Sequence, residues 1–333
     1  MARYPTHEVA YPRVTLDDTD HPLPRRPDSR MRYAYFSTIA KGGTCIISSC
    51  KDLHLMRTIC HKQLRADLAD NPVLQRRFIR EARVTAMLQH PNTIPTYELG
   101  RSADGHPYFT MKLVYGATFR EILESCAAAQ SHNVDGRSLM KLIDVLSQVG
   151  HALHYAHRHG VVHRDVKPEN ILVGPFDEVL LLDWGLAKVW GKDDEQLDAN
   201  STDDAESASE DETDVSLTSK APLDATPAYM SPEQLISRNA VDRRSDIYSW
   251  GAILYELLTL RRMVQGETVN RVLDFLRHGQ VQKPTARPSG VPVSKHLAEI
   301  CMSCVARDPG MRYQSMDHVI DHLEEWLLDP TYD

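Results

Sequence analysis

His163-Arg164-Asp165-Val166-Lys167-Pro168-Glu169-Asn170 is the most informative stretch of this chain, and Asp183-Trp184-Gly185 begins thirteen residues after its last residue. The two pieces offer a carboxylate that can act as a general base, a lysine that can bind a phosphate, and two side chains with hard oxygen atoms for a metal ion. The plain alternative is a polar surface loop. The spacing of the whole set disfavours that alternative and indicates phosphoryl-transfer chemistry.

Bulk composition is that of an ordinary globular protein. The chain has 333 residues, of which 42% are hydrophobic and 25% charged, enough for one two-lobed domain or two smaller ones. No stretch approaches the roughly 18–20 apolar residues that cross a bilayer, and residues 1–30 lack the apolar core of a secretory signal. Six cysteines do not indicate a disulfide framework. The sequence therefore predicts a reducing, cytoplasmic location and no membrane segment.

The net charge of −8 is concentrated in one place. The segment from Asp193 to Asp214 contains eleven acidic residues and no Lys or Arg, and the rest of the chain is near neutral to slightly basic. Whole-chain charge therefore gives no reason to expect a nucleic-acid partner. Dense like charge and few apolar residues predict a disordered acidic insert at about 192–220.

Local patterns predict where structure begins. Prolines at 5, 12, 22, 24 and 27 indicate a disordered arm over residues 1–30. Short strands are expected over 33–65 around a Gly42-Gly43 turn, a helix from Asn71-Pro72, and two more strands up to Met111 around Asp104-Gly105.

Past Gly116 the pattern becomes mainly helical. An apolar stripe runs from Leu139 to Leu153 and is ended by Gly160. Two short apolar runs, 171–173 and 179–182, each end beside a motif residue, which predicts that the motifs lie on loops at strand ends. Residues 242–260 are apolar on most faces, as a buried central helix would be.

The order of these motifs over residues 33 to about 328 resembles the eukaryotic-like protein kinase family. Tyr108–Val114, Ala225–Gln234 and the Asp-Trp-Gly variant are similar to bacterial serine/threonine kinases. The resemblance implies an α+β fold of two lobes, with ATP and Mg²⁺ (or Mn²⁺) bound between a small antiparallel sheet with one helix and a larger, mainly helical lobe. The implied boundaries are a kinase domain at 31–328, an N-lobe at about 31–114, a C-lobe at about 115–328 and a tail at 329–333.

The resemblance assigns roles to the motif residues by position. Asp165 would accept or orient the proton of the substrate hydroxyl. Lys167 would stabilise the transferring phosphoryl group and favour Ser/Thr over Tyr substrates. Asn170 and Asp183 would hold the metal ion.

Other motif residues match structural parts of the family. Glu233 is expected to pair with Arg312, and Asp246 and Trp250 to lie on a structural helix. His163 and Trp184 are expected to pack in the column of side chains between the lobes.

The glycine-rich loop matches the family poorly. It reads Ala40-Lys41-Gly42-Gly43-Thr44-Cys45-Ile46-Ile47, so that the first family glycine is Ala40 and the third is Cys45. A β-carbon restricts positive φ and close approach of the backbone to phosphate. The loop is therefore expected to cradle ATP less well, or in a changed shape.

The rest of the nucleotide site is assigned by register. In Ile59-Cys60-His61-Lys62, the lysine would bind the α- and β-phosphates and pair with Glu81. A plain surface lysine is the alternative interpretation of Lys62. Lys51 is the other lysine available, but it lies too near the loop. Met111 would lie at the back of the adenine pocket. The remaining candidates could equally be core residues; they are Lys112 and Val114 at the hinge, and Ile47, Cys60 and Leu172 around the base.

Regulation is expected in the segment between Asp183 and Glu233. In the family a phosphate there pairs with the arginine of His-Arg-Asp, here Arg164. Thr218 is the first candidate phosphosite; the others are Ser216, Ser219 and Thr226. A solvated insert without a regulatory role, or docking of a basic protein partner, are the alternatives.

The sequence thus favours a serine/threonine protein kinase that transfers the ATP γ-phosphoryl group to protein hydroxyls, with autophosphorylation in the activation segment. One alternative is a pseudokinase scaffold, favoured by Ala40 and Cys45. The other is an interaction module that uses its acidic segment. Cys301-x-x-Cys304 is a weak metal signal without a second pair and is interpreted as buried small residues.

Overall fold

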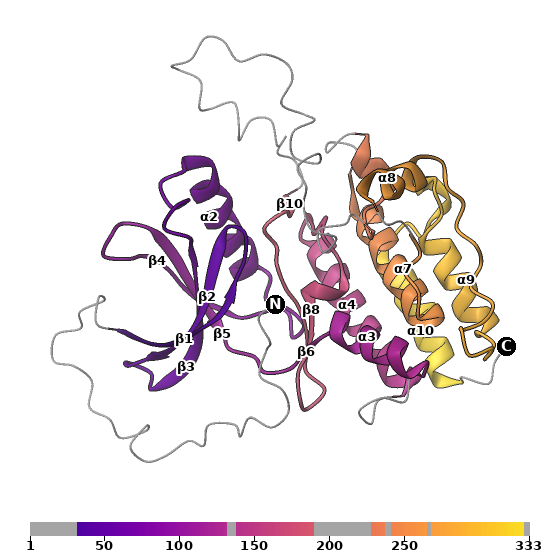
Figure 1. The fold of residues 1–333 in the computed structure, drawn as a ribbon, viewed down its shortest axis with the longest axis horizontal. Coiled ribbons are helices and arrows are strands. Elements are labelled where there is room, and N and C mark those ends of the chain that lie inside the picture. The colour runs from indigo at the N-terminus through magenta and orange to yellow at the C-terminus, as the bar shows by residue number, and fades with distance from the viewer. Residues whose placement is uncertain (1–31, 132–137, 190–227, 237–240, 265–267, 330–333) are drawn as a thin grey trace, which may run out of the picture. The chain divides into compact units, whose positions relative to one another are not determined.

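The computed structural model describes residues 32–131, 138–189, 228–236, 241–264 and 268–329. They form two compact units, one containing the chain up to Glu121 together with Glu169–Leu186, and the other containing Ile122–Pro168 together with the chain from Ala187 onward. We call the first the strand unit and the second the helical unit (Figure 1). The predicted arm at 1–30 and the insert at about 192–220 lie outside the described residues.

The strand unit is built on a five-stranded antiparallel sheet of order β1-β2-β3-β5-β4. Its strands are β1 (Tyr33–Lys41), β2 (Cys45–Asp52), β3 (Arg57–Leu64), β4 (Thr96–Arg101) and β5 (Pro107–Lys112). The predicted turns at Gly42-Gly43 and Asp104-Gly105 are confirmed. Gly105 has a φ of 82°, a conformation that glycine adopts without strain.

Helix α2 (Pro72–Met87) begins where the sequence predicts it. The Asn71 side chain accepts hydrogen bonds from the backbone N–H groups of Val73 and Leu74, and Pro72 occupies the first turn. The helix packs against β4 and β5 (Figure 1). Phe78 and Ala82 join a buried cluster whose other members are Leu64, Ala69 and Phe109.

A second, smaller sheet completes the strand unit. It contains β6 (Ala117–Thr118), β8 (Ile171–Val173) and β9 (Val179–Leu181) in the order β6-β8-β9. Gly116 lies so close to β8 that an added Cβ would be 2.3 Å from the carbonyl oxygen of Val173. Only glycine permits this approach, so the segment after β5 is held tightly against the β8–β9 hairpin.

Helix α3 (Phe119–Ala129) contains the boundary between the two units. It starts with a capping box, in which the Thr118 backbone N–H donates to Glu121 Oε2 at 2.8 Å and the Glu121 N–H donates to Thr118 Oγ1 at 3.2 Å. This reciprocal pair fixes where the chain leaves β6 and turns into a helix.

The helical unit is organised around α7 (Arg243–Thr259), nearly all of whose residues are buried. This confirms the predicted buried central helix. The Trp250 indole N–H donates to the carbonyl oxygen of Leu146 at 2.9 Å, and Gly251 allows close approach of Cys304. The other helices of this unit are α4 (Leu139–Arg158), α8 (Val269–His278), α9 (Lys295–Cys304) and α10 (Met316–Leu328).

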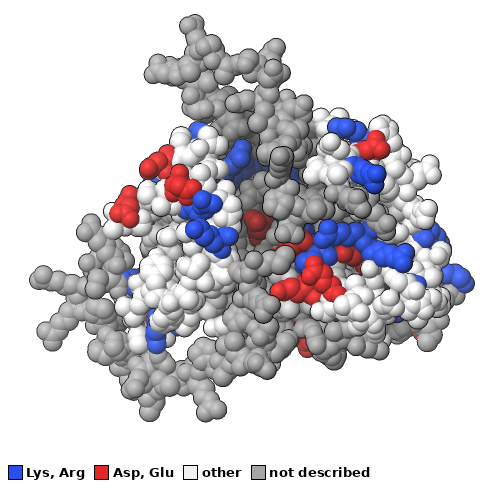
Figure 2. Space-filling view, in the orientation of Figure 1, with Lys and Arg blue, Asp and Glu red and all other residues white. Residues whose placement is uncertain are grey.

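Charged side chains of both signs are mixed over the described surface that faces the viewer in Figure 2. In the part of the chain that the structure describes, no helix combines the length and the apolar character needed to cross a membrane.

Candidate active site

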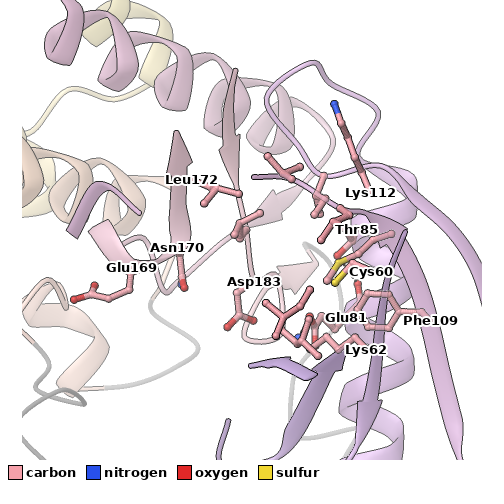
Figure 3. A pocket seen from close by; sticks show the side chains of 17 residues that line it. Cys60, Lys62, Glu81, Thr85, Phe109, Lys112, Glu169, Asn170, Leu172 and Asp183 are labelled. Carbon is pink, nitrogen blue, oxygen red and sulfur yellow. Dashed lines mark hydrogen bonds and ion pairs between the residues drawn. The ribbon is translucent and has the colours of Figure 1, made fainter. Parts of the chain in front are cut away.

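The strand unit contains a cavity of about 150 Å³ (Figure 3). Strands β2, β3 and β5, helix α2 and the β8–β9 hairpin all contribute to its wall. Of the residues proposed from the sequence, it brings together Ile47, Cys60, Lys62, Glu81, Met111, Lys112, Val114, Asn170, Leu172 and Asp183.

Lys62 and Glu81 form an ion pair in this cavity. The Lys62 ammonium lies 2.5 Å from Glu81 Oε1, and the two side chains are 12% and 11% exposed. The predicted pairing is therefore confirmed, and the interpretation of Lys62 as a plain surface lysine is wrong. Lys51 lies elsewhere, in β2 opposite Thr58, and does not line the cavity.

Electrostatics keep Lys62 charged. Burial by itself would lower the pKa of Lys62, but the carboxylates of Glu81 and Asp183 outweigh burial and raise that pKa above its usual value. Burial raises the pKa of Glu81, and Asp183 acts in the same direction against the attraction of Lys62. The cavity thus presents one ammonium group to two closely placed carboxyl groups.

Asn170 and Asp183 reach the same end of the β8–β9 hairpin because one precedes β8 and the other follows β9. The strands pair antiparallel, and the Leu182 N–H donates to the Asn170 carbonyl oxygen at 2.7 Å. Asp183 has a φ of 63°, a strained conformation for a non-glycine residue. Since carboxylate and amide oxygens suit Mg²⁺, this donor set fits a magnesium ion.

Gly185 allows the acidic groups to crowd together. Its N–H donates to Asp183 Oδ1 at 3.2 Å. An added Cβ would lie 3.1 Å from that oxygen and 3.5 Å from Glu81 Oε2. The glycine of Asp-Trp-Gly is therefore needed for packing at the site.

Much of the remaining wall is apolar. Cys60 is buried, and burial raises the pKa of its thiol to about 12. At neutral pH it is therefore a neutral wall residue and a poor nucleophile. Leu172 packs with Ile94, Val114 and Leu180 in a buried cluster, and the first three of these residues line the cavity.

The end of β5 is fixed by two contacts of Lys112. The Lys112 backbone N–H donates to the carbonyl oxygen of Pro95 at 3.0 Å, and its ammonium group pairs with Glu178 on the β8–β9 hairpin. Figure 3 shows the Lys112 side chain directed away from the other labelled residues.

Of the residues predicted to bind the nucleotide, three do not line the cavity. Ala40 lies in β1, and Gly42 and Gly43 lie in the turn between β1 and β2. Sequence reasoning missed other lining residues: Ile39, Thr85, Ile94, Phe109, Leu113, Glu169 and Leu182. Thr85 could have been found from helical spacing, since it lies one turn after Glu81 on the same face.

Asp165 and Lys167 belong to the helical unit. The Lys167 ammonium lies 2.7 Å from Asp165 Oδ2. The loop that carries them is fixed by Asp246 of α7, whose carboxylate accepts the backbone N–H groups of His163 and Arg164, each at 2.8 Å.

Asp246 is fully buried and is also bonded to the His157 ring at 2.8 Å. Although burial would raise the pKa of Asp246, the His157 hydrogen bond and the nearby histidine charges lower it below its usual value. An ionised carboxylate at neutral pH therefore accepts the backbone hydrogen bonds that hold the loop of Asp165.

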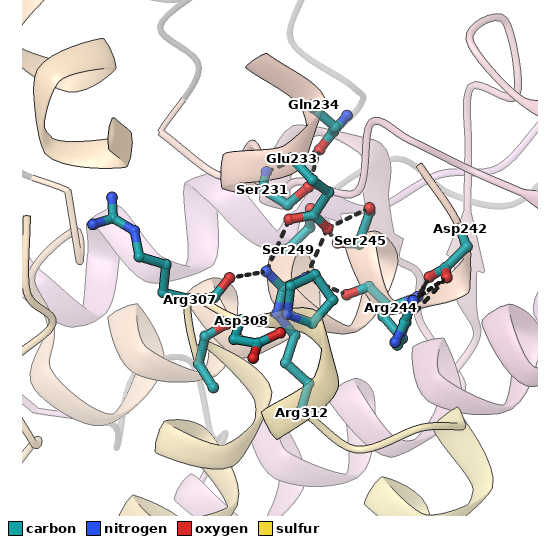
Figure 4. Close-up of polar contacts among 12 residues, drawn as sticks. Ser231, Glu233, Gln234, Asp242, Arg244, Ser245, Ser249, Arg307, Asp308 and Arg312 are labelled. Atoms are coloured by element: carbon teal, nitrogen blue, oxygen red, sulfur yellow. Dashed lines mark hydrogen bonds and ion pairs between the residues drawn. The ribbon is translucent and has the colours of Figure 1, made fainter. Parts of the chain in front are cut away.

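A second polar network of the helical unit contains the predicted Glu233–Arg312 pair (Figure 4). Arg312 Nη1 donates to Glu233 Oε1 at 2.7 Å and Nη2 donates to Oε2 at 2.9 Å. The Ser245 hydroxyl also donates to Glu233 Oε1, at 2.6 Å. The neighbouring Gln234 amide donates to the carbonyl oxygen of Arg164 at 2.9 Å. The segment of Glu233 is thus tied to the loop of Asp165.

Several predicted residues lie outside the described residues: Ser216, Thr218, Ser219 and Thr226. Within the described part of the chain, no three His, Cys, Asp or Glu side chains are grouped as metal ligands. Cys301 and Cys304 are both buried in α9, as predicted.

Comparison with known proteins identifies the family. The model of the protein kinase domain matches residues 33–324. Serine/threonine-protein kinase PknD of Protochlamydia amoebophila is 33% identical over 89% of this chain, which covers 30% of that relative. PknD of Chlamydia pneumoniae is 32% identical, and the match covers 89% of this chain and 31% of that relative.

A probable serine/threonine-protein kinase of Streptomyces coelicolor, SCO3848, is 32% identical, with 89% of this chain and 40% of the relative covered. The chain thus spans about three tenths to two fifths of the length of these relatives. The antiparallel sheet unit and the helical unit agree with the two-lobed kinase fold. This chain belongs to the protein kinase family, and its relatives are eukaryotic-like serine/threonine kinases of bacteria.

Proposed function

We propose that this chain is a serine/threonine protein kinase that transfers the γ-phosphoryl group of ATP to a Ser or Thr hydroxyl of a protein substrate. The observation that carries the proposal is the buried Lys62–Glu81 pair, which shares one cavity with Asn170 and Asp183. A structural ion pair alone would not need two further oxygen ligands beside it.

The cavity supports nucleotide binding. Its apolar wall suits a flat base, and the backbone after β5 offers hydrogen-bonding groups to the edge of that base. The charged Lys62 ammonium, held by Glu81, would bind the α- and β-phosphates.

Asn170 and Asp183 would hold Mg²⁺ or Mn²⁺. When bound, such an ion neutralises charge on the phosphate oxygens. The carboxylates of Asp183 and Glu81 repel each other. A cation bound at Asp183 would offset that repulsion.

Asp165 and Lys167 would act on the substrate side. Asp165 orients the substrate hydroxyl and accepts its proton as the oxygen forms a bond to the γ-phosphorus. The bond from that phosphorus to the bridging oxygen breaks, and ADP leaves with the electron pair. Lys167, 2.7 Å from Asp165, would offset charge on the transferred group.

The test is incorporation of label from γ-³²P-ATP with Mg²⁺ or Mn²⁺, into the protein itself and into a generic basic protein substrate. Asp165→Asn is the matched control because it keeps shape and removes the base. Label that is lost in this variant supports the proposal. Equal label in both proteins contradicts it.

A pseudokinase scaffold is the second candidate, and Ala40 and Cys45 at two glycine positions favour it. Nucleotide binding by the unaltered protein, without any label transfer, would support that candidate. The proposal also includes autophosphorylation at Thr218, Ser216, Ser219 or Thr226, which mass spectrometry of labelled protein would detect. Its absence from active protein would remove that part.

A further inference from the structure

Arg65 braces the turn between β1 and β2, which takes the place of the glycine-rich loop. Its backbone N–H donates to the Thr44 carbonyl oxygen at 2.9 Å, and its guanidinium Nη1 donates to the Gly43 carbonyl oxygen at 3.1 Å. One residue therefore fixes two consecutive carbonyl groups of the turn. The only contact that the turn makes with itself among the described backbone groups is the Gly42 N–H bond to the Cys45 carbonyl, at 2.9 Å.

Asp67 fixes the orientation of Arg65. Arg65 Nε donates to Asp67 Oδ1 at 3.0 Å, and Nη2 donates to Oδ2 at 2.8 Å. This two-point contact holds the guanidinium plane and leaves Nη1 free to reach Gly43. The two side chains are 32% and 58% exposed, so the brace lies on the surface of the strand unit.

The contact between Arg65 and the Gly43 carbonyl also sets the direction of the Thr44 N–H, because the two groups belong to the same peptide unit. In a planar trans peptide the C=O and the following N–H point in opposite directions. Because the Gly43 carbonyl points at Arg65, the Thr44 N–H points away from it. Among the described residues, neither the Gly43 nor the Thr44 N–H has an acceptor, so both are available to a ligand.

The side to which the Thr44 N–H points follows from strand alternation. Lys62 and Leu64 share the face of β3 that lines the cavity and the core. Arg65 follows Leu64 directly and continues onto the opposite face. Cys45 pairs with Leu64 and Ile47 with Lys62, so the turn lies just beyond the end of β3. Since the Thr44 N–H points away from Arg65, we expect it on the face of the sheet that carries Lys62. A backbone N–H group favours anions.

We infer that Arg65, braced by Asp67, is a positioning residue that aims the Thr44 amide at the phosphates of ATP. In a glycine-rich loop, backbone freedom lets the amides turn towards the phosphates. In this turn, where Ala40 and Cys45 replace two of the glycines, the guanidinium contact would orient the amide instead. The inference rests on the proposed function only in taking ATP as the nucleotide.

The test is the dissociation constant of ATP and of adenosine, measured by calorimetry on the full chain. The variants are Arg65→Met, Arg65→Lys and Asp67→Asn. All three should weaken ATP binding about tenfold or more, the loss expected for one hydrogen bond to a charged group. Adenosine, which has no phosphate, should bind them as it binds the unaltered protein.

Arg101→Met is the matched control. Arg101 Nη1 donates to the Gly105 carbonyl oxygen at 2.7 Å, so it makes the same kind of contact in the β4–β5 turn of the same sheet. This variant should change neither constant. Unchanged adenosine binding also shows that each variant is folded, and Asp67→Asn alters only an exposed side chain if Arg65→Met fails to fold.

If Arg65 instead contacted the phosphate directly, Arg65→Lys and Asp67→Asn would change ATP affinity differently. Arg65→Lys would then keep most of the affinity, and Asp67→Asn would tighten ATP because it removes a negative charge. Either result overturns the inference, as does unaltered protein that binds ATP no more tightly than adenosine. Because no phosphoryl transfer is measured, failure of the kinase proposal is seen separately, as bound ATP without label transfer.

Discussion

Arg312 and Glu233 are joined by two hydrogen bonds although they lie far apart in the sequence. The guanidinium donates to both carboxylate oxygens, and the Arg312 side chain is fully buried. The pKa of Glu233 is lowered, because the Arg312 hydrogen bonds and charge outweigh the opposing effect of burial. This pair therefore anchors the segment that begins at Ser231 to the turn before α10.

Loss of this pair should strongly destabilise the protein. Arg312→Met leaves the Glu233 carboxylate buried without its main partner, and we expect a loss of about 3–5 kcal/mol in the free energy of unfolding. Urea denaturation would measure it. Lys283→Met is the control, since its exposed pair with Glu299 should contribute less than ~1 kcal/mol. Equal losses in the two variants would contradict the prediction.

His61 should make stability depend on pH. Its ring is buried, stacks on Tyr108 with centroids 4.6 Å apart, and is bonded to the Tyr35 hydroxyl at 2.9 Å. Burial lowers the pKa of His61 to about 4, against the opposing charge of Glu98. The unfolded chain therefore takes up the proton first as pH falls.

The stability that this histidine confers should be complete above about pH 6.5 and should decline towards pH 4. At pH 5 the expected loss is about 2 kcal/mol. Urea midpoints of the unaltered protein and of His61→Phe, compared at pH 7.5 and pH 5, would measure it. The variant keeps an aromatic ring but does not titrate, so its midpoint should change less. Identical changes would show that other groups cause the dependence.

Lys62→Met should abolish most phosphoryl transfer. It removes the ammonium group that pairs with Glu81 and attracts Asp183, so that these two carboxyl groups lose the charge between them. We expect transfer to fall by about 10²–10³-fold, as for loss of one donor to a charged transition state. Lys51→Met, in the neighbouring strand, should keep near-normal activity. Initial rates of label transfer would decide, and retained activity in Lys62→Met would contradict the assignment.

Gly116→Ala should disturb the contact between the segment after β5 and the β8–β9 hairpin. The added methyl group would lie 2.3 Å from the backbone oxygen of Val173, and backbone cannot move aside cheaply. Overpacking of this kind costs about 1–3 kcal/mol. Gly43→Ala is the control, because a Cβ there meets nothing within 4 Å. Thermal unfolding should separate the two, and equal melting temperatures would refute the packing argument.

Local sequence patterns predict the elements that carry the site. Asn71-Pro72 starts α2 because a side-chain cap and a proline in the first turn act within a few residues. Hairpins form at Gly42-Gly43 and Asp104-Gly105 because turn-forming residues also act within a few residues. The spacing from Asp165 to Asp183 identified the chemistry, because groups that act together lie within one short stretch.

Tertiary structure alone decided how distant residues meet. The register of β3 against β2 and β5 brings the Lys62 side chain within reach of Glu81 on α2, whereas Lys51 pairs with Thr58. Lining residues such as Ile39 and Phe109 carry no signal that separates a cavity wall from a core. The brace of Arg65 on Gly43 depends on which carbonyl a guanidinium reaches across two strands. Sequence periodicity states which face a side chain occupies, whereas packing and register determine what it touches.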